Sequence, residues 1–134
     1  MTVLDASAVL ELLLATAAGE RIRRRLRDAE ETLCAPHLMD VEVAHALRRY
    51  EQVGALSAVR GSEALQDLAE LPLTRFPHDH LLGRIWELRH NVTAYDAAYI
   101  ALAEALRATL ITCDGKLASA RNRGLRVELF PVEE

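Results

Sequence analysis

Met1-Thr2-Val3-Leu4-Asp5-Ala6-Ser7 opens the chain as a short apolar segment that runs directly into a carboxylate. Near the other end, Thr109-Leu110-Ile111-Thr112-Cys113-Asp114 repeats the arrangement. A continuous apolar run of this kind is typical of a strand buried in a parallel sheet. An acid that follows such a strand faces the crevice at the carboxyl edge of the sheet, where α/β proteins bind their ligands. We therefore expect Asp5 and Asp114 to face one crevice.

Strand and helix patterns alternate along the chain, without a linker or an internal repeat. This order predicts an α/β fold, a three-layer α/β/α sandwich around a mainly parallel sheet of about five strands, in a single domain over residues 1–134. Strands are predicted at 2–4, 32–35, 73–76 and 109–113, with 126–130 as an outer strand. The first helix is predicted to have Ser7 as its cap, the second to run from Gly19 to Ala29, and the third to run from Pro36 to near Gly54. Further helices are predicted over 57–71, 79–90 and 95–106, and a short one is predicted just before Gly124.

The composition is that of a globular protein, with 51% hydrophobic and 27% charged residues. Asp5 and Glu11 interrupt the apolar start and no basic residue precedes it, which argues against an export signal. No apolar run is long enough to span a bilayer. Cys34 and Cys113 fall in predicted buried strands and are interpreted as small core residues in a reducing compartment. We expect a cytoplasmic protein that makes no membrane contact.

The basic residues are unusual because fifteen of the sixteen are arginine, Lys116 being the exception. A net charge of −4 argues against a broad basic surface for nucleic acids. Five arginines nevertheless lie between Arg21 and Arg27, and arginine binds phosphate or carboxylate with two parallel hydrogen bonds. The run can contact RNA or an acidic partner, or it can be a solvated helix face, and the sequence leaves these alternatives open.

Two further acids lie in helical stretches whose neighbours are apolar. Glu42 comes three residues after Met39 and four before Ala46, so it falls beside the predicted core-facing stripe of its helix. Asp96 opens a helix that is apolar almost all round. A buried charge without a partner costs several kcal/mol, on the order of measured protein values. Both acids therefore require a partner.

Most of these acids also have a purely structural explanation. Asp5 can cap a helix, Asp114 can occupy a turn, and Thr93 with Asp96 resembles a capping box. Four such coincidences are a weaker explanation than one shared cause. That cause is a hard cation held by oxygen ligands, which would relieve the repulsion among converging carboxylates.

Four segments carry a resemblance to a known family, each containing one of the four acids: 3–7, 35–44, 93–99 and 110–114. They closely resemble PIN-domain ribonucleases, and more narrowly the VapC-type toxins of bacterial toxin–antitoxin pairs. The resemblance spans nearly the whole chain in the family's order. Some family members carry a further acid shortly after the position of Asp114. Lys116 and Ser119 occupy that region here, which weakens the case for a second metal held by protein alone.

The resemblance implies a catalytic cluster of Asp5, Glu42, Asp96 and Asp114 that binds magnesium or manganese, with Ser7, Thr93 and Thr112 as supporting hydroxyls. Asp5 and Asp96 are the expected direct ligands. Glu42 is expected to hold or orient a water of the metal, and Asp114 to bind a second ion or the outer shell. The implied activity is that of a metal-dependent endoribonuclease, a hydrolase of phosphodiester bonds in RNA.

A partner is implied as well, because a toxin of this kind is restrained by a VapB-like antitoxin. The helices predicted over 7–29 and 38–50 carry more apolar residues than one core-facing stripe requires. An antitoxin can lay an amphipathic segment into a groove between them. The same residues can instead close a homodimer interface, and both arrangements can hold together.

Two other function classes remain as alternatives. A receiver-like signalling module also has acids at strand ends, a magnesium ion and a lysine. It would need an acidic pair after the first strand and a phospho-accepting aspartate at the end of a central strand, whereas Asp5 is alone and the strand at 73–76 is followed by Pro77. The second alternative is a non-catalytic binding protein of the same fold, against which the intact acids argue.

Overall fold

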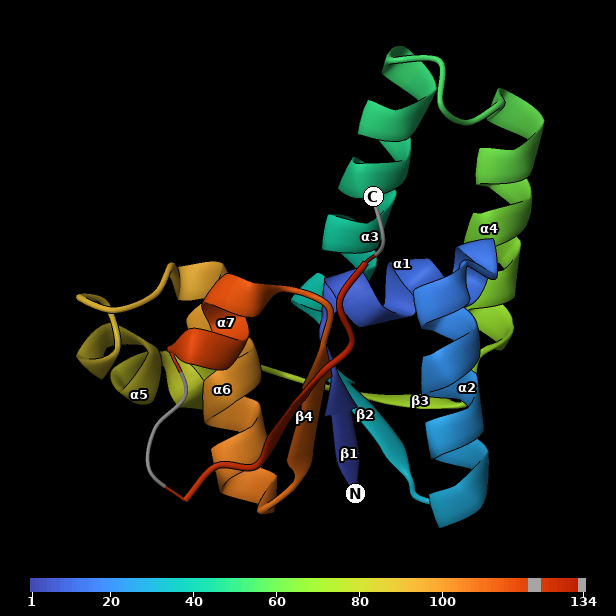
Figure 1. Ribbon diagram of the computed structural model, residues 1–134. Helices are drawn as coiled ribbons and strands as arrows, with labels where there is room; N and C mark the ends of the chain where they lie inside the picture. Colours follow the sequence, from blue (N-terminus) through green and yellow to red (C-terminus); the bar gives the residue numbers. More distant parts are fainter. Residues whose placement is uncertain (121–123, 133–134) are drawn as a thin grey trace.

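The computed structural model describes residues 1–120 and 124–132, and places five strands in one sheet of order β3-β2-β1-β4-β5 (Figure 1). The strands are β1 (Thr2–Leu4), β2 (Leu33–Pro36), β3 (Leu73–Phe76), β4 (Thr109–Thr112) and β5 (Val127–Leu129). Every pairing is parallel. The predicted α/β fold with a parallel sheet of about five strands is confirmed, and β5 is the predicted outer strand.

The strand order reverses next to β1. The chain moves from β1 through β2 to β3 on one side, then returns to build β4 and β5 on the other. Val3 of β1 therefore pairs with Cys34 on one side and with Leu110 on the other. A reversal of this kind opens a crevice at the carboxyl ends of the two strands beside it, which here are β1 and β4.

Helices cover the sheet on both faces (Figure 1). On one face α1 (Ala6–Leu14) packs against α2 (Ala17–Ala29), α3 (Leu38–Gln52) and α4 (Ala58–Glu70). On the other face α6 (Ala94–Leu106) packs against β1, β2 and β4 and also against α5 (Leu82–Glu87). A short α7 (Gly115–Ser119) follows β4, and α3 and α4 extend as a pair beyond the carboxyl edge of the sheet.

The core explains why α6 has no polar face. Its residues 97–103 are all buried, because the helix lies against three strands and against α5. Val3, Leu4, Leu110 and Ile111 of the two central strands are completely buried. The prediction of a helix packed between other elements is confirmed. Cys34 is buried as expected, whereas Cys113 lies just beyond β4 and is only partly buried.

Two helix starts differ from the prediction. Ser7 was expected to cap the first helix, but Asp5 is the N-cap and its side chain accepts from the Ala8 backbone N–H. The strand ends directly in the helix, so the acid itself takes the capping position. The second helix begins at Ala17, before Gly19, and Thr16 caps it.

The helix predicted over 79–90 is shorter than expected. A 3₁₀ turn (Asp79–Leu81) leads into α5, which ends at Glu87. The backbone N–H groups of Asn91 and Val92 both donate to the Leu88 carbonyl and close a turn that redirects the chain into α6. Within the described ranges, no helix is long and apolar enough to cross a membrane.

Gly19 offers a test of how closely α1 and α2 pack. A Cβ built on Gly19 would lie 2.0 Å from the backbone oxygen of Glu11, whereas one built on Gly83 in α5 would meet nothing within 4 Å. We expect Gly19→Ala to lower the free energy of unfolding by about 1–3 kcal/mol, because backbone cannot move aside as a flexible side chain can. The matched change Gly83→Ala should be neutral or stabilising by up to about 1 kcal/mol. Urea unfolding of both variants measures this, and equal stabilities would contradict the packing described.

Candidate active site

The elements that carry the four predicted acids come together at the carboxyl edge of the sheet, beside the reversal in strand order (Figure 1). Asp5 follows β1 and caps α1, while Asp114 follows β4 and caps α7 by accepting from the Lys116 backbone N–H. Glu42 lies in the second turn of α3 and Asp96 in the first turn of α6. Each acid thus comes from a different part of the chain.

Asp5 is the most buried of the four, with 5% of its surface exposed. Its Oδ1 accepts from the Ser7 hydroxyl at 2.7 Å and from the Ala8 backbone N–H at 2.9 Å. Its Oδ2 accepts from the Thr112 hydroxyl at 2.5 Å. These hydrogen bonds fix the carboxylate in one orientation.

The two hydroxyls that bind Asp5 also hold the turn after β4. Ser7 Oγ accepts from the Cys113 backbone N–H and Thr112 Oγ1 from the Asp114 backbone N–H, each at 2.9 Å. Because each hydroxyl donates to Asp5 and accepts from the turn, they tie the ends of β1 and β4 together. The structure therefore brings Ser7, Thr112 and Asp114 together around Asp5.

Thr93 has a different place. Its hydroxyl accepts from the Asp96 backbone N–H at 3.1 Å and caps α6, which sets the position of Asp96 without touching its carboxylate. Asp40 similarly positions Glu42, because it receives two hydrogen bonds from Arg75, at 2.7 and 2.9 Å, that hold the start of α3 against β3.

The charges of the acids act on one another. Burial raises the pKa of Asp5 to about 6, opposed by the hydrogen bonds from Thr112, Ser7 and Ala8 and supported by the charge of Asp96. Burial likewise raises the pKa of Asp96, with a further contribution from the charge of Asp114. Burial and then the charge of Asp96 raise the pKa of Glu42. Asp96 is therefore the acid through which all four are electrostatically linked.

This donor set fits a hard divalent cation. Within 1–120 and 124–132, no three Asp, Glu, His or Cys side chains form a ready-made metal site. A closed set of three is not required, because magnesium keeps several waters and is usually held by one or two carboxylates together with substrate phosphate. Besides burial, the charge of Asp96 raises the pKa values of Asp5 and Glu42, and the charge of Asp114 raises that of Asp96, so the charge of such an ion would offset their repulsion.

Tyr99 is a residue of this site that the sequence interpretation missed. It lies one helical turn after Asp96, is 1% exposed, and donates from its hydroxyl to Glu42 Oε1 at 2.5 Å. Burial and then Glu42 raise the pKa of this phenol, so it stays protonated and can donate. The sequence contained a signal for this contact, because a tyrosine on the buried side of a helix needs a hydrogen-bond partner for its hydroxyl.

A hollow of about 670 Å³ opens beside these acids, between α1, α3 and the start of α6. Tyr95 stands at its edge with 63% of its surface exposed. The lining is mostly apolar but includes two site residues and two basic groups. It consists of Ala6, Ser7, Leu10, Leu38, Val41, Glu42, His45, Ala46, Arg49 and Tyr95.

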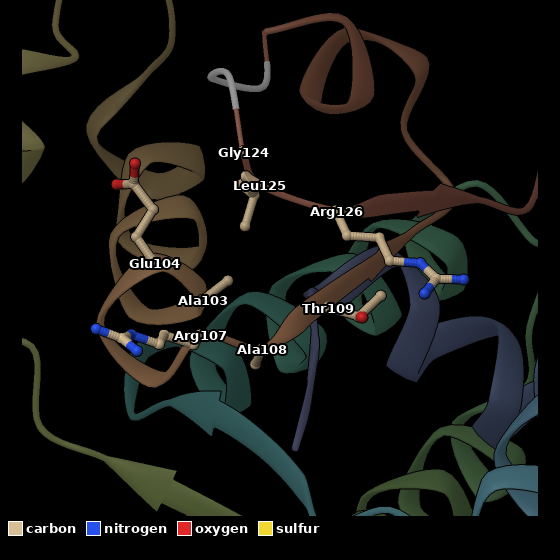
Figure 2. A pocket seen from close by; sticks show the side chains of 8 residues that line it. All are labelled: Ala103, Glu104, Arg107, Ala108, Thr109, Gly124, Leu125 and Arg126. Carbon is tan, nitrogen blue, oxygen red and sulfur yellow. The ribbon is translucent and has the colours of Figure 1, made fainter.

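A second hollow, of about 520 Å³, lies at the opposite end of β4 (Figure 2). Thr109, the first residue of β4, and Gly124 belong to its lining. The side chains of Arg107 and Arg126 point away from one another there (Figure 2), so they do not converge on a common ligand. The carboxyl edge of the sheet, which carries the four acids, is therefore the better candidate for the active site.

Three arginines of the run between Arg21 and Arg27 make contacts within the protein. Arg21 donates to the Pro131 carbonyl at 2.8 Å, and Arg23 donates to the Leu12 carbonyl at 3.3 Å. Arg25 pairs with Glu128 of β5 at 2.9 Å. These contacts hold α2 against α1 and the C-terminal segment, so much of the run has a structural use.

Comparison with known proteins gives consistent matches. The model of the PIN domain family matches residues 2–122. VapC ribonuclease Mb0985 of Mycobacterium bovis is 42% identical over 98% of this chain and 99% of its own length. Ribonuclease VapC12 of Mycobacterium tuberculosis is 43% identical over 96% and 98%.

Solved structures share the fold. The structure of PAE2754 from Pyrobaculum aerophilum matches with a TM-score of 0.68 and 25% identity over 94% of this chain and 82% of that one. VapBC2 from Rickettsia felis, bound to a DNA fragment from its promoter, matches with a TM-score of 0.68 and 14% identity over 96% and 98%.

The raised pKa of Asp5 predicts how stability depends on pH in metal-free buffer. Asp5 binds its proton more tightly in the folded protein, with a pKa near 6, than in the unfolded chain, near 3.8. Ionisation therefore costs stability, and the free energy of unfolding should fall as pH rises from about 4 to about 7, by at most about 3 kcal/mol from Asp5. Glu42 and Asp96 act in the same direction. Urea unfolding in EDTA at several pH values measures the fall.

Asp5→Asn removes the group that titrates, so its curve should be flatter than that of the wild type. Asp79→Asn, at an exposed position, makes the same change in charge and should leave the wild-type slope. An equally steep fall in Asp5→Asn would contradict the assignment to Asp5.

Proposed function

The chain belongs to the PIN domain family, and on that premise we propose that it is a magnesium-dependent endoribonuclease that acts as the toxin of a toxin–antitoxin pair. Manganese is the alternative ion. The observation that carries the proposal is the linked set of four carboxylates at the strand reversal, in a chain 42% identical over nearly its whole length to a protein named a VapC ribonuclease. Because the chain belongs to this family, we set aside the alternative of a receiver-like signalling module.

Each acid has a proposed part in the chemistry. Asp5 and Asp96 would bind the ion directly, Asp114 would bind its outer shell or a second ion, and Glu42 would orient the attacking water. A bound divalent ion supplies charge neutralisation at the phosphate oxygens. The chain supplies orientation, because the hydroxyls of Ser7 and Thr112 hold the Asp5 carboxylate by hydrogen bonds.

The hollow beside the acids suits an RNA strand. Arg49 and His45 offer contacts to backbone phosphates, and the exposed ring of Tyr95 offers a surface on which a base can stack. These groups line the same hollow as Ser7 and Glu42, so a strand held there would pass the acids. Phosphate contacts of this kind are independent of sequence.

The same hollow suits an antitoxin. Solved relatives of the same fold include a toxin–antitoxin complex from Klebsiella pneumoniae and VapBC from Salmonella typhimurium bound to DNA. We propose that a VapB-like partner lays the apolar face of a helix against α1 and α3, where Leu10, Leu38 and the 72% exposed Val41 line the hollow. Such a partner would cover the approach to the acids. A homodimer through other exposed apolar residues is compatible with this arrangement.

The nuclease proposal predicts that Asp5→Asn or Asp96→Asn abolishes RNA cleavage while the fold survives. Each change removes a negative charge from the proposed ion site, and the rate should fall by at least about 100-fold, as for the loss of one preorganised electrostatic contact. The assay uses a panel of defined RNAs with magnesium, with manganese and with EDTA. Chelation should stop the wild type, and Asp79→Asn should cleave normally.

Circular dichroism checks that the inactive variants are folded. Undiminished cleavage by both Asp5→Asn and Asp96→Asn would refute the catalytic assignment. A wild type that binds RNA without cutting any of the panel would favour the non-catalytic alternative.

The antitoxin proposal predicts that the product of the adjacent reading frame co-purifies with the chain and suppresses its cleavage of RNA. Val41→Glu should weaken the complex by at least about tenfold, because it introduces a charge into an apolar contact. Val59→Glu on α4 is the matched control, since Val59 is 69% exposed and lies outside the lining of the hollow. Binding is measured by calorimetry. The hypothesis fails for that neighbour if it neither binds nor inhibits.

A further inference from the structure

Tyr99 joins two elements that each carry an acid of the site. It lies in α6 with Asp96, and its hydroxyl donates to Glu42 of α3 at 2.5 Å. The backbone of Ala6, the residue after Asp5 and the first of α1, lowers the pKa of this hydroxyl, whereas the charge of Asp5 raises it. The start of α1 therefore lies close to the phenol as well.

The contact with Glu42 is specific. Among the described residues, the bond from Tyr99 is the one side-chain hydrogen bond recorded for the Glu42 carboxylate. The bond engages Oε1, and Glu42 is also one of the residues that line the hollow. The ring is fixed by the core, because Tyr99 is one of the largest completely enclosed side chains of the protein.

A glutamate on a half-exposed helix position samples several side-chain rotamers, and each immobilised torsion has an entropic cost. A donor held rigidly by the core removes this freedom before substrate arrives. Filling the core does not by itself explain the residue, because phenylalanine would fill the same space without a buried hydroxyl that needs partners.

We infer that Tyr99 is a positioning residue, which fixes the Glu42 carboxylate in the orientation that the cleavage reaction uses. The inference rests on the proposed function, since it assigns a part in that reaction to a residue that does not itself face the substrate.

The test compares Tyr99→Phe, which removes only the hydroxyl, with Tyr50→Phe, which makes the same change at an exposed position on α3. Two quantities are measured: RNA cleavage as kcat and KM, and the affinity for Mn²⁺ alone by calorimetry. We expect Tyr99→Phe to lower kcat or the Mn²⁺ affinity by about tenfold or more, as for the loss of other groups that orient ligands, with KM for RNA within about twofold. Tyr50→Phe should match the wild type in both.

A double-mutant cycle with Glu42→Gln separates positioning from a general effect on the fold. If Tyr99 acts through Glu42, adding Tyr99→Phe to Glu42→Gln should cause no further loss, whereas independent effects would multiply. The inference would be overturned if the double variant lost activity by the product of the two single losses. It would also be overturned if Tyr99→Phe equalled Tyr50→Phe in both measurements.

Failure of the inference is distinguishable from failure of the proposed function. If Glu42→Gln changes neither measurement, Tyr99 has nothing to position and the inference is wrong, while Asp5→Asn still reports on the nuclease. If the wild type cleaves no RNA, the nuclease proposal fails and the Mn²⁺ measurement alone decides about Tyr99. Unchanged Mn²⁺ affinity in Tyr99→Phe would then refute the inference.

Discussion

The hydrogen bond from Thr112 to Asp5 is the interaction on which the site depends, because it joins the two strands between which the sheet order reverses. Asp5 directly follows β1, caps α1 and accepts this hydrogen bond, so one carboxylate links the end of the strand, the start of the helix and the crevice. Thr112 ends β4 and at the same time accepts from the Asp114 backbone N–H. The geometry around Asp5 is thus determined by backbone elements that cannot shift independently.

This arrangement has an electrostatic cost. Without a cation, the folded protein holds acids with raised pKa values close together. The hydroxyls of Ser7 and Thr112 offset part of the burial of Asp5 but do not remove the repulsion from Asp96. A site that destabilises the protein persists only where the rest of the fold compensates, and the buried residues of β1, β4 and α6 supply that compensation here. Strain concentrated at one edge of the sheet is typical of a functional site.

The sequence predicted the fold well because its signals are local. Short apolar runs placed each of the five strands to within one residue at either end, and the acids that follow β1 and β4 were placed at the correct edge. The predicted helix cap at Ser7 was wrong because two capping residues, Asp5 and Ser7, lie only two positions apart and the sequence does not say where the strand ends. The contact between Tyr99 and Glu42 joins residues 57 positions apart, and local spacing carries no information about such a pair.

The arginine run shows the same limit of local patterns. The sequence left open whether its residues form a solvated helix face, yet Arg25 pairs with Glu128 and Arg21 donates to the Pro131 carbonyl, both more than 100 positions away. These bonds fix the last strand and the C-terminal segment to α2, on the same side of the protein as α1. Since α1 begins at Asp5, the C-terminal segment supports the acidic edge indirectly. A protein with net charge −4 can therefore use arginines within its own structure, while Arg49 lines the hollow together with Glu42.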